Sequence, residues 1–114
     1  EEIMELKDYR DKHKDKYPSN WEEIEKAMIS KQPYCSLCGD EGKEDGNELQ
    51  VHHIVPVHID ISKNGDEDNL IVLCHHCHLR IAHCGDYEKY YNLEIKKDSE
   101  TVYKDIQKYK EANS

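Results

Sequence analysis

The chain has 114 residues, a net charge of −9 and a composition that is 36% hydrophobic and 36% charged. This length excludes two independent hydrophobic cores, and no apolar run reaches the roughly 18 residues that a membrane-spanning helix needs. The composition is too polar for a large core and too rich in tyrosine for simple disorder, so a feature other than burial should help to hold the fold together.

Residues 1–30 are expected to form an N-terminal helical arm. Residues 1–17 alternate charges with sparse apolar positions, a pattern typical of a solvated helix. Ser19 and Glu22 stand at capping-box spacing and predict the start of a second helix. The apolar face of that helix would comprise Trp21, Ile24, Ala27 and Met28. Trp21 is therefore expected to be a packing anchor rather than a base-stacking residue.

Four of the five cysteines form two C-x2-C pairs, Cys35/Cys38 and Cys74/Cys77. Pairs of this kind supply four thiolates to one tetrahedral zinc ion, and such a site has no open position for catalysis. Cys84 is left over as a spectator thiol, and the odd count argues against a disulfide framework. We therefore expect a structural Zn²⁺, no membrane association and a reducing, cytoplasmic location.

Two short strands and a helix are predicted around the second half of this arrangement. Residues 49–57 are rich in Val, Ile and Leu and predict one strand, residues 70–73 predict the returning strand, and residues 74–83 predict a helix. The acidic stretches 39–48 and 60–68 are expected to be loops. They carry much of the negative charge that otherwise argues against a partner made of phosphates.

Residues 86–114 are expected to form a C-terminal helical extension. Residues 98–100 can cap its helix, whose role should be packing rather than chemistry. The predicted apolar stripe comprises Val102, Tyr103, Ile106 and Tyr109. Before it, Tyr87, Tyr90 and Tyr91 look exposed and would either join an interface or pack on the zinc core.

Three segments together resemble a known motif. Residues 51–56 (VHHIVP), 68–70 (DNL) and 73–78 (LCHHCH) are similar to the zinc-containing form of the HNH endonuclease motif, and the resemblance covers Cys35 to about Arg80. It implies an α+β fold with a small ββα-metal (His-Me finger) core stapled by a four-cysteine zinc site, here residues 31–85, with flanking helices. It also implies metal-dependent cleavage of DNA.

The resemblance assigns roles to the histidines. His53 would be the general base, Asn69 the residue that orients it, and His52 with His78 the ligands of a catalytic divalent ion. Adjacent strand residues point to opposite faces, so one of the two neighbouring histidines can turn to the ion and the other to the attacking water. A neutral imidazole accepts a proton at physiological pH. His83 is a candidate third ligand or phosphate contact, with a structural role weighted slightly above these.

Other positions refine this hypothesis. Arg80 is the only basic side chain between Lys63 and Lys89 and is the best candidate for gripping a phosphate, the alternative being an ordinary exposed charge. Many family members carry Asp where this chain has His52, and nitrogen-rich coordination favours Mn²⁺ or Ni²⁺ over Mg²⁺. The remaining histidines are expected to be incidental, namely His13 and His58 on the surface and His75 and His76 within the knuckle.

DNA is the expected partner, and a single site per chain should nick as a monomer, whereas a homodimer can cut both strands. Phage packaging or restriction proteins are the partners that the resemblance suggests, with the host cytoplasm as the location for a phage protein. Two alternatives stay open at this point. One is a noncatalytic zinc module that binds protein or nucleic acid, and the other is a zinc-dependent hydrolase acting on a different substrate.

Overall fold

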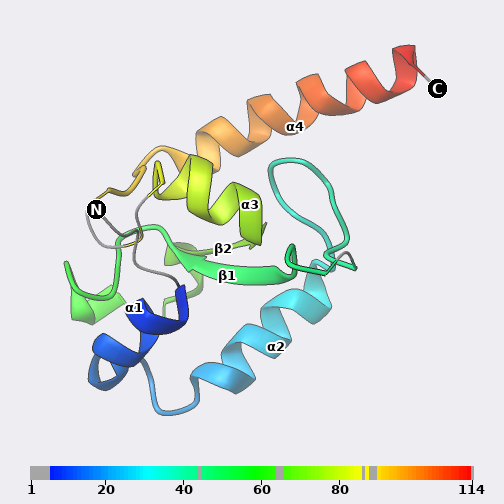
Figure 1. Cartoon of the computed structure of the whole chain (residues 1–114). Helices are drawn as coiled ribbons and strands as arrows, with labels where there is room; N and C mark the ends of the chain where they lie inside the picture. Colours follow the sequence, from blue (N-terminus) through cyan, green and yellow to red (C-terminus); the bar gives the residue numbers. More distant parts are fainter. Residues whose placement is uncertain (1–5, 44, 64–65, 86, 88–89, 114) are drawn as a thin grey trace.

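The computed structural model describes residues 6–43, 45–63, 66–85, 87 and 90–113. At its centre, β1 (Leu49–His53) and β2 (Leu70–Cys74) form a two-stranded antiparallel sheet (Figure 1). The helices are α1 (Leu6–Lys12), α2 (Trp21–Lys31), α3 (His75–Cys77), the π-helix η4 (His78–Ala82) and α4 (Ile95–Ala112). Three short 3-10 helices, η1 (Lys14–Lys16), η2 (Ile61–Lys63) and η3 (Glu67–Asn69), lie in the connections. Within the described ranges, every helix is too short or too polar to cross a membrane.

The two faces of the sheet are covered by different helices (Figure 1). One face packs on α2 through Trp21, Val51, Leu70 and Val72. The opposite face packs on η4 and α4 through Ile71, Leu73, Ala82 and Ile95, together with the buried cysteines. Side chains alternate between the faces of a strand, so β1 sends every second residue towards α2 and the others towards η4. The predicted α+β fold with a ββα core is confirmed.

The first strand is shorter than predicted. It ends at His53, not at residue 57, because the chain turns at Pro56, where the Ile59 N–H donates to the Pro56 carbonyl at 2.9 Å. The Asn69 side chain holds the backbone of Val55 in this turn. The turn places the end of β1, with its two histidines, at the edge of the core.

The outer helices also differ from expectation in detail. The N-cap of α2 is Asn20 and not Ser19, and no side chain caps it, so the capping box does not form. Ala27 is exposed on this helix. Helix α4 begins at Ile95, earlier than residues 98–100 suggested, and Tyr109 is 70% exposed because the last turns extend beyond the core.

Residues 6–17 are packed on the core, which corrects the prediction of a solvated helix for this part of the segment; residues 1–5 lie outside the described residues. Tyr9 of α1 is buried against Val57 and Tyr87, so Tyr87 is buried as well. The Tyr9 hydroxyl forms a 2.7 Å hydrogen bond with His58 Nδ1, and the His13 ring is buried and stacks on His58 at 5.1 Å. A tyrosine can bury its ring while its hydroxyl keeps a partner, so Tyr9 helps to dock a polar helix.

Candidate metal centre and active site

The four paired cysteines converge on one point, as predicted. Their sulfur atoms all lie within 4.8 Å of one another. The first pair sits on a turn closed by a hydrogen bond from the Gly39 N–H to the Cys35 carbonyl, and the second pair brackets helix α3. Cys38 Sγ lies 3.8 Å from Cys74 Sγ. This is close to the edge of roughly 3.8 Å that a tetrahedron with Zn–S bonds of about 2.3 Å has, so the cluster fits zinc.

The pKa values of Cys35 and Cys38 are shifted by contacts among these thiols and by burial. The pKa of Cys35 is lowered to about 5, chiefly because the Cys77 thiol donates a hydrogen bond to its sulfur. Burial raises the pKa of Cys38 to about 11. Cysteines bind a metal as thiolates, so binding of a metal would release the protons of the remaining thiols.

A second cluster consists of three histidines. The ring nitrogens of His52, His78 and His83 lie within 4.8 Å of one another, and all three residues are buried. Their ring centroids are 4.7 to 5.0 Å apart. His52 comes from β1, whereas His78 begins η4 and His83 follows its end. The structure thus brings the two predicted ligands together with the candidate third ligand.

The π-helix explains how His78 and His83 share a face. The His83 N–H donates to the His78 carbonyl at 3.1 Å, which is the i to i+5 bond of a π turn. In an α-helix, residues five apart would lie about 140° apart around the axis. The wider turn brings both rings to the same side. The printed sequence gives no sign of this turn, which is why the spacing alone left the role of His83 open.

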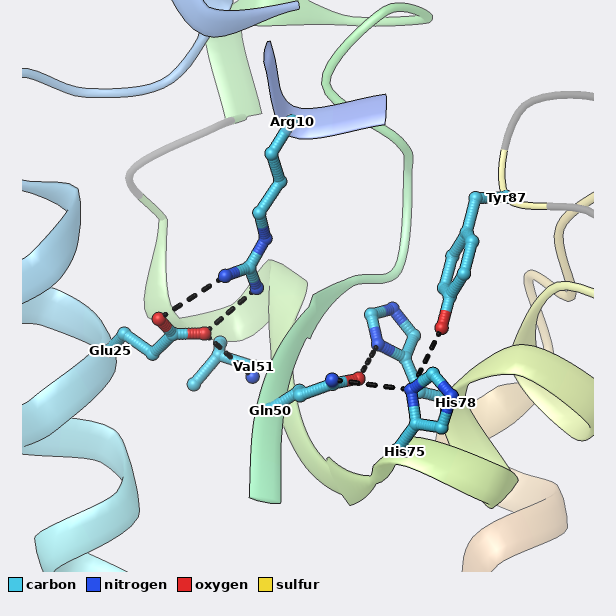
Figure 2. A network of polar contacts seen from close by, with 7 residues as sticks. All are labelled: Arg10, Glu25, Gln50, Val51, His75, His78 and Tyr87. Atoms are coloured by element: carbon cyan, nitrogen blue, oxygen red, sulfur yellow. Dashed lines mark hydrogen bonds and ion pairs between the residues drawn. The ribbon is translucent and has the colours of Figure 1, made fainter. Parts of the chain in front are cut away.

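Hydrogen bonds set the orientation of two of the three rings. The amide oxygen of Gln50 accepts from His78 Nδ1 at 2.9 Å (Figure 2), and the carbonyl of Tyr90 accepts from His83 Nδ1 at 2.9 Å. Because these oxygens can only accept, each ring carries a proton on Nδ1, which leaves Nε2 as the nitrogen that could bind a metal. Sequence reasoning missed Gln50, although its place two residues before His52 puts it on the same strand face.

The third ring has no such partner. Both nitrogens of His52 are buried and lack a hydrogen-bond partner in the part of the chain that the structure describes. Burial lowers the pKa of His52 and of His78 well below the usual value, so both rings are neutral. Buried polar atoms without a partner are rare because they are costly. A divalent ion held by the three imidazoles would supply the missing partner of His52, so these residues fit a metal.

His53 approaches the same place from the other face of β1. Its ring stacks on Trp21 at 4.6 Å and meets the edge of Tyr17 at 5.5 Å, so Trp21 is the packing anchor that the sequence predicted. Because the strand ends here, both neighbouring histidines reach one small cavity of about 10 Å³, room for about one water molecule. The cavity is lined by His52, His53, His78 and His83 together with residues of α1.

Asn69 is buried beside this site, but its side chain is engaged elsewhere. Its amide oxygen accepts from the Val55 N–H at 2.8 Å, and its amide nitrogen donates to the carbonyls of Val55 and Lys63 at 3.1 and 3.3 Å. These contacts fix the loop that leaves β1. The role of Asn69 in orienting the His53 ring stays a prediction.

The family model for HNH endonuclease matches residues 35–94, more than half of the chain. The chain belongs to the HNH endonuclease family. The match includes both cysteine pairs, the hairpin and η4, and it ends before α4. No curated protein and no solved structure matches the chain. Membership supports a nuclease-type function for the protein in general terms.

The role of Arg80 as a phosphate contact stays a prediction, and a different arginine lines the histidine cavity. Arg80 is exposed on η4 and makes no hydrogen bond or ion pair with the described residues. Arg10 of α1 lines the cavity instead and pairs with Glu25 of α2 at 2.8 Å. Figure 2 shows that Glu25 also accepts from the Val51 N–H, at 3.2 Å. Sequence reasoning missed Arg10 because its partner lies fifteen residues away on another helix.

Proposed function

We propose that the protein is a metal-dependent endonuclease that hydrolyses phosphodiester bonds of DNA, with His53 as the general base. The observation that carries this proposal is the meeting of His53 with three buried imidazoles at one cavity. The family supplies the reaction class, and the cavity supplies a base and a metal-binding set within reach of one another. A noncatalytic zinc module would have no use for a buried His52 whose two nitrogens lack partners in the described structure.

His52, His78 and His83 would hold the divalent ion through ring nitrogens. When bound, the ion supplies Lewis-acid stabilisation of the phosphate and of the leaving oxygen. His53 takes the proton of the attacking water, since a neutral imidazole is a suitable base at physiological pH. The stacked Trp21 holds the His53 ring in place, and the Asn69 side chain supports the loop behind it.

The composition of the ligand set bears on the choice of metal. Three imidazoles and no carboxylate favour Mn²⁺ or Ni²⁺ over Mg²⁺, which prefers oxygen ligands. The cysteine cluster would hold a separate structural Zn²⁺ and take no part in the reaction. We expect nicking to be faster in Mn²⁺ than in Mg²⁺ at the same concentration; equal rates would contradict the assigned ligand set.

Plasmid nicking by the purified chain tests the function. We expect Mn²⁺- or Ni²⁺-dependent conversion of supercoiled to open-circular DNA that is lost in His53→Ala. The matched control is His76→Ala, which removes an exposed imidazole near the cysteine cluster and should leave nicking unchanged. Both variants must retain zinc and a cooperative unfolding transition. If the parent protein is inert with every metal, the noncatalytic zinc module becomes the better explanation.

A further inference from the structure

The buried polar side-chain atoms that lack a partner gather around the histidine cavity. Among the described residues they belong to Arg10, Trp21 and His52. Arg10 and His52 line the cavity itself, and Trp21 stacks on His53 at its edge. A divalent ion would account for His52, but the Arg10 Nε–H and the Trp21 Nε1–H can only donate. Since folded proteins leave few such atoms unsatisfied, these two donors indicate a ligand that brings hydrogen-bond acceptors.

The guanidinium of Arg10 is held firmly while part of it stays available. Its two terminal nitrogens face the Glu25 carboxylate at 2.8 and 3.4 Å, and Glu25 is itself tied to the backbone of β1. The guanidinium carbon lies 5.9 Å from the centre of the Trp21 ring. A guanidinium has five N–H donors. Arg10 also hydrogen-bonds the Tyr17 side chain, and its buried Nε–H is without a partner in the described chain.

Arg10 also stands between the cavity and the surface. Arg10 and Tyr17 line both the histidine cavity and an open groove of about 470 Å³ at the corner between α1 and α2. The other charged residues of the groove are Asp11, Lys14, Glu22 and Glu23, so carboxylates outnumber cations there. The groove therefore lacks a general attraction for phosphates. Among the residues that line the cavity, Arg10 is the one permanent cation.

We propose that Arg10 binds a nonbridging oxygen of the scissile phosphate and is a catalytic residue supplied from outside the HNH motif. The proposal rests on the nuclease function given above. Glu25 would orient one edge of the guanidinium, and the phosphate would take the remaining donors. A positioned cationic donor stabilises the negative charge that develops on the phosphate oxygens during attack by water.

Three variants test the role of Arg10 in cleavage. Arg10→Ala should lower kcat for nicking about 10- to 100-fold. Arg10→Lys should lower kcat by a smaller factor, and Lys26→Ala should nick DNA at the rate of the parent. Lys26 is a matched control because it is an exposed cation on α2, one residue from Glu25. Millimolar guanidinium should restore part of the activity of Arg10→Ala only. Thermal unfolding of each variant shows whether the substitution destabilises the fold. A loss of activity caused only by a damaged fold would not be restored by guanidinium.

A second readout keeps the proposal separate from the nuclease function. Binding of a fluorescein-labelled DNA duplex is followed by anisotropy without added divalent ion, so that no cleavage occurs. Arg10→Ala should bind about 10-fold more weakly than Lys26→Ala. If the parent cuts no DNA but this difference is found, the phosphate contact holds and the hydrolytic function fails. If Arg10→Ala matches Lys26→Ala in both binding and cleavage, the role of Arg10 is refuted.

Discussion

Gln50 and His78 connect strand β1 to helix η4 through a 2.9 Å hydrogen bond between the amide oxygen and the ring Nδ1. The amide nitrogen of Gln50 in turn lies 3.3 Å from His75 Nδ1, which also contacts the Tyr87 hydroxyl at 3.3 Å (Figure 2). His75 stands directly after Cys74. A chain of polar contacts therefore runs from a proposed catalytic ligand to the cysteine cluster.

We predict that Gln50→Leu weakens binding of the catalytic ion about 10- to 100-fold, because His78 loses the partner that fixes its tautomer and ring orientation. Gln50→Glu keeps an acceptor at this position and should bind Mn²⁺ at least as tightly as the parent. Calorimetric titration of the zinc-loaded protein with Mn²⁺ measures the difference. Equal dissociation constants for the parent and Gln50→Leu would show that the bond does not position the ligand.

We predict that acid destabilises the protein in the absence of the catalytic ion, in part through His52. Burial holds the pKa of His52 well below 6.5 in the folded state, whereas the unfolded chain takes up a proton near pH 6.5. The contribution of His52 to the free energy of unfolding is therefore complete above pH 6.5. It is lost as the pH falls below 6.5, by up to about 1.4 kcal/mol per pH unit.

Urea unfolding at pH 7.5, 6.5 and 5.5 measures this effect. The comparison is with His52→Leu, in which the thiols and the other histidines are unchanged. The free energy of unfolding of the variant should fall less steeply with acid than that of the parent. Parallel pH profiles for the two proteins would mean that His52 is not the titrating group.

Asn69→Ala should lower the free energy of unfolding by about 1–3 kcal/mol, because it leaves the half-buried N–H of Val55 without its acceptor. The loop after β1 should loosen, and amide hydrogen exchange at Val55 should become faster. Nicking should fall as a consequence of the displaced His53. A variant with parental stability and parental exchange at Val55, but without activity, would instead point to a direct role of Asn69 at the base.

The sequence was sufficient for those parts of the site that depend on local patterns. Cysteine spacing predicted the sulfur cluster, and strand periodicity predicted that His52 and His53 face opposite sides. These features follow from a few adjacent residues. The division into residues 1–30, 31–85 and 86–114 stays a prediction.

Other parts depend on contacts that no local pattern contains. His83 reaches its place through a π turn, and the choice between α and π geometry is made by packing. Arg10 and Tyr9 lie in a segment whose sparse apolar residues resemble those of a solvated helix, yet the buried Tyr9 ring and the Arg10–Glu25 pair dock it on the core. Such docking depends on partners far along the chain, so it became visible only in the fold.

The stacking of Trp21 on His53 has a consequence for how proteins with this motif differ. The proposed metal ligands lie inside the matched segment 35–94, whereas Trp21, which packs on the proposed base His53, comes from the preceding helix α2. Two chains can thus share an identical set of ligands and still differ in how steadily the base is held. The motif would then determine which reaction is catalysed, whereas the sequence that precedes the motif would determine how fast it runs.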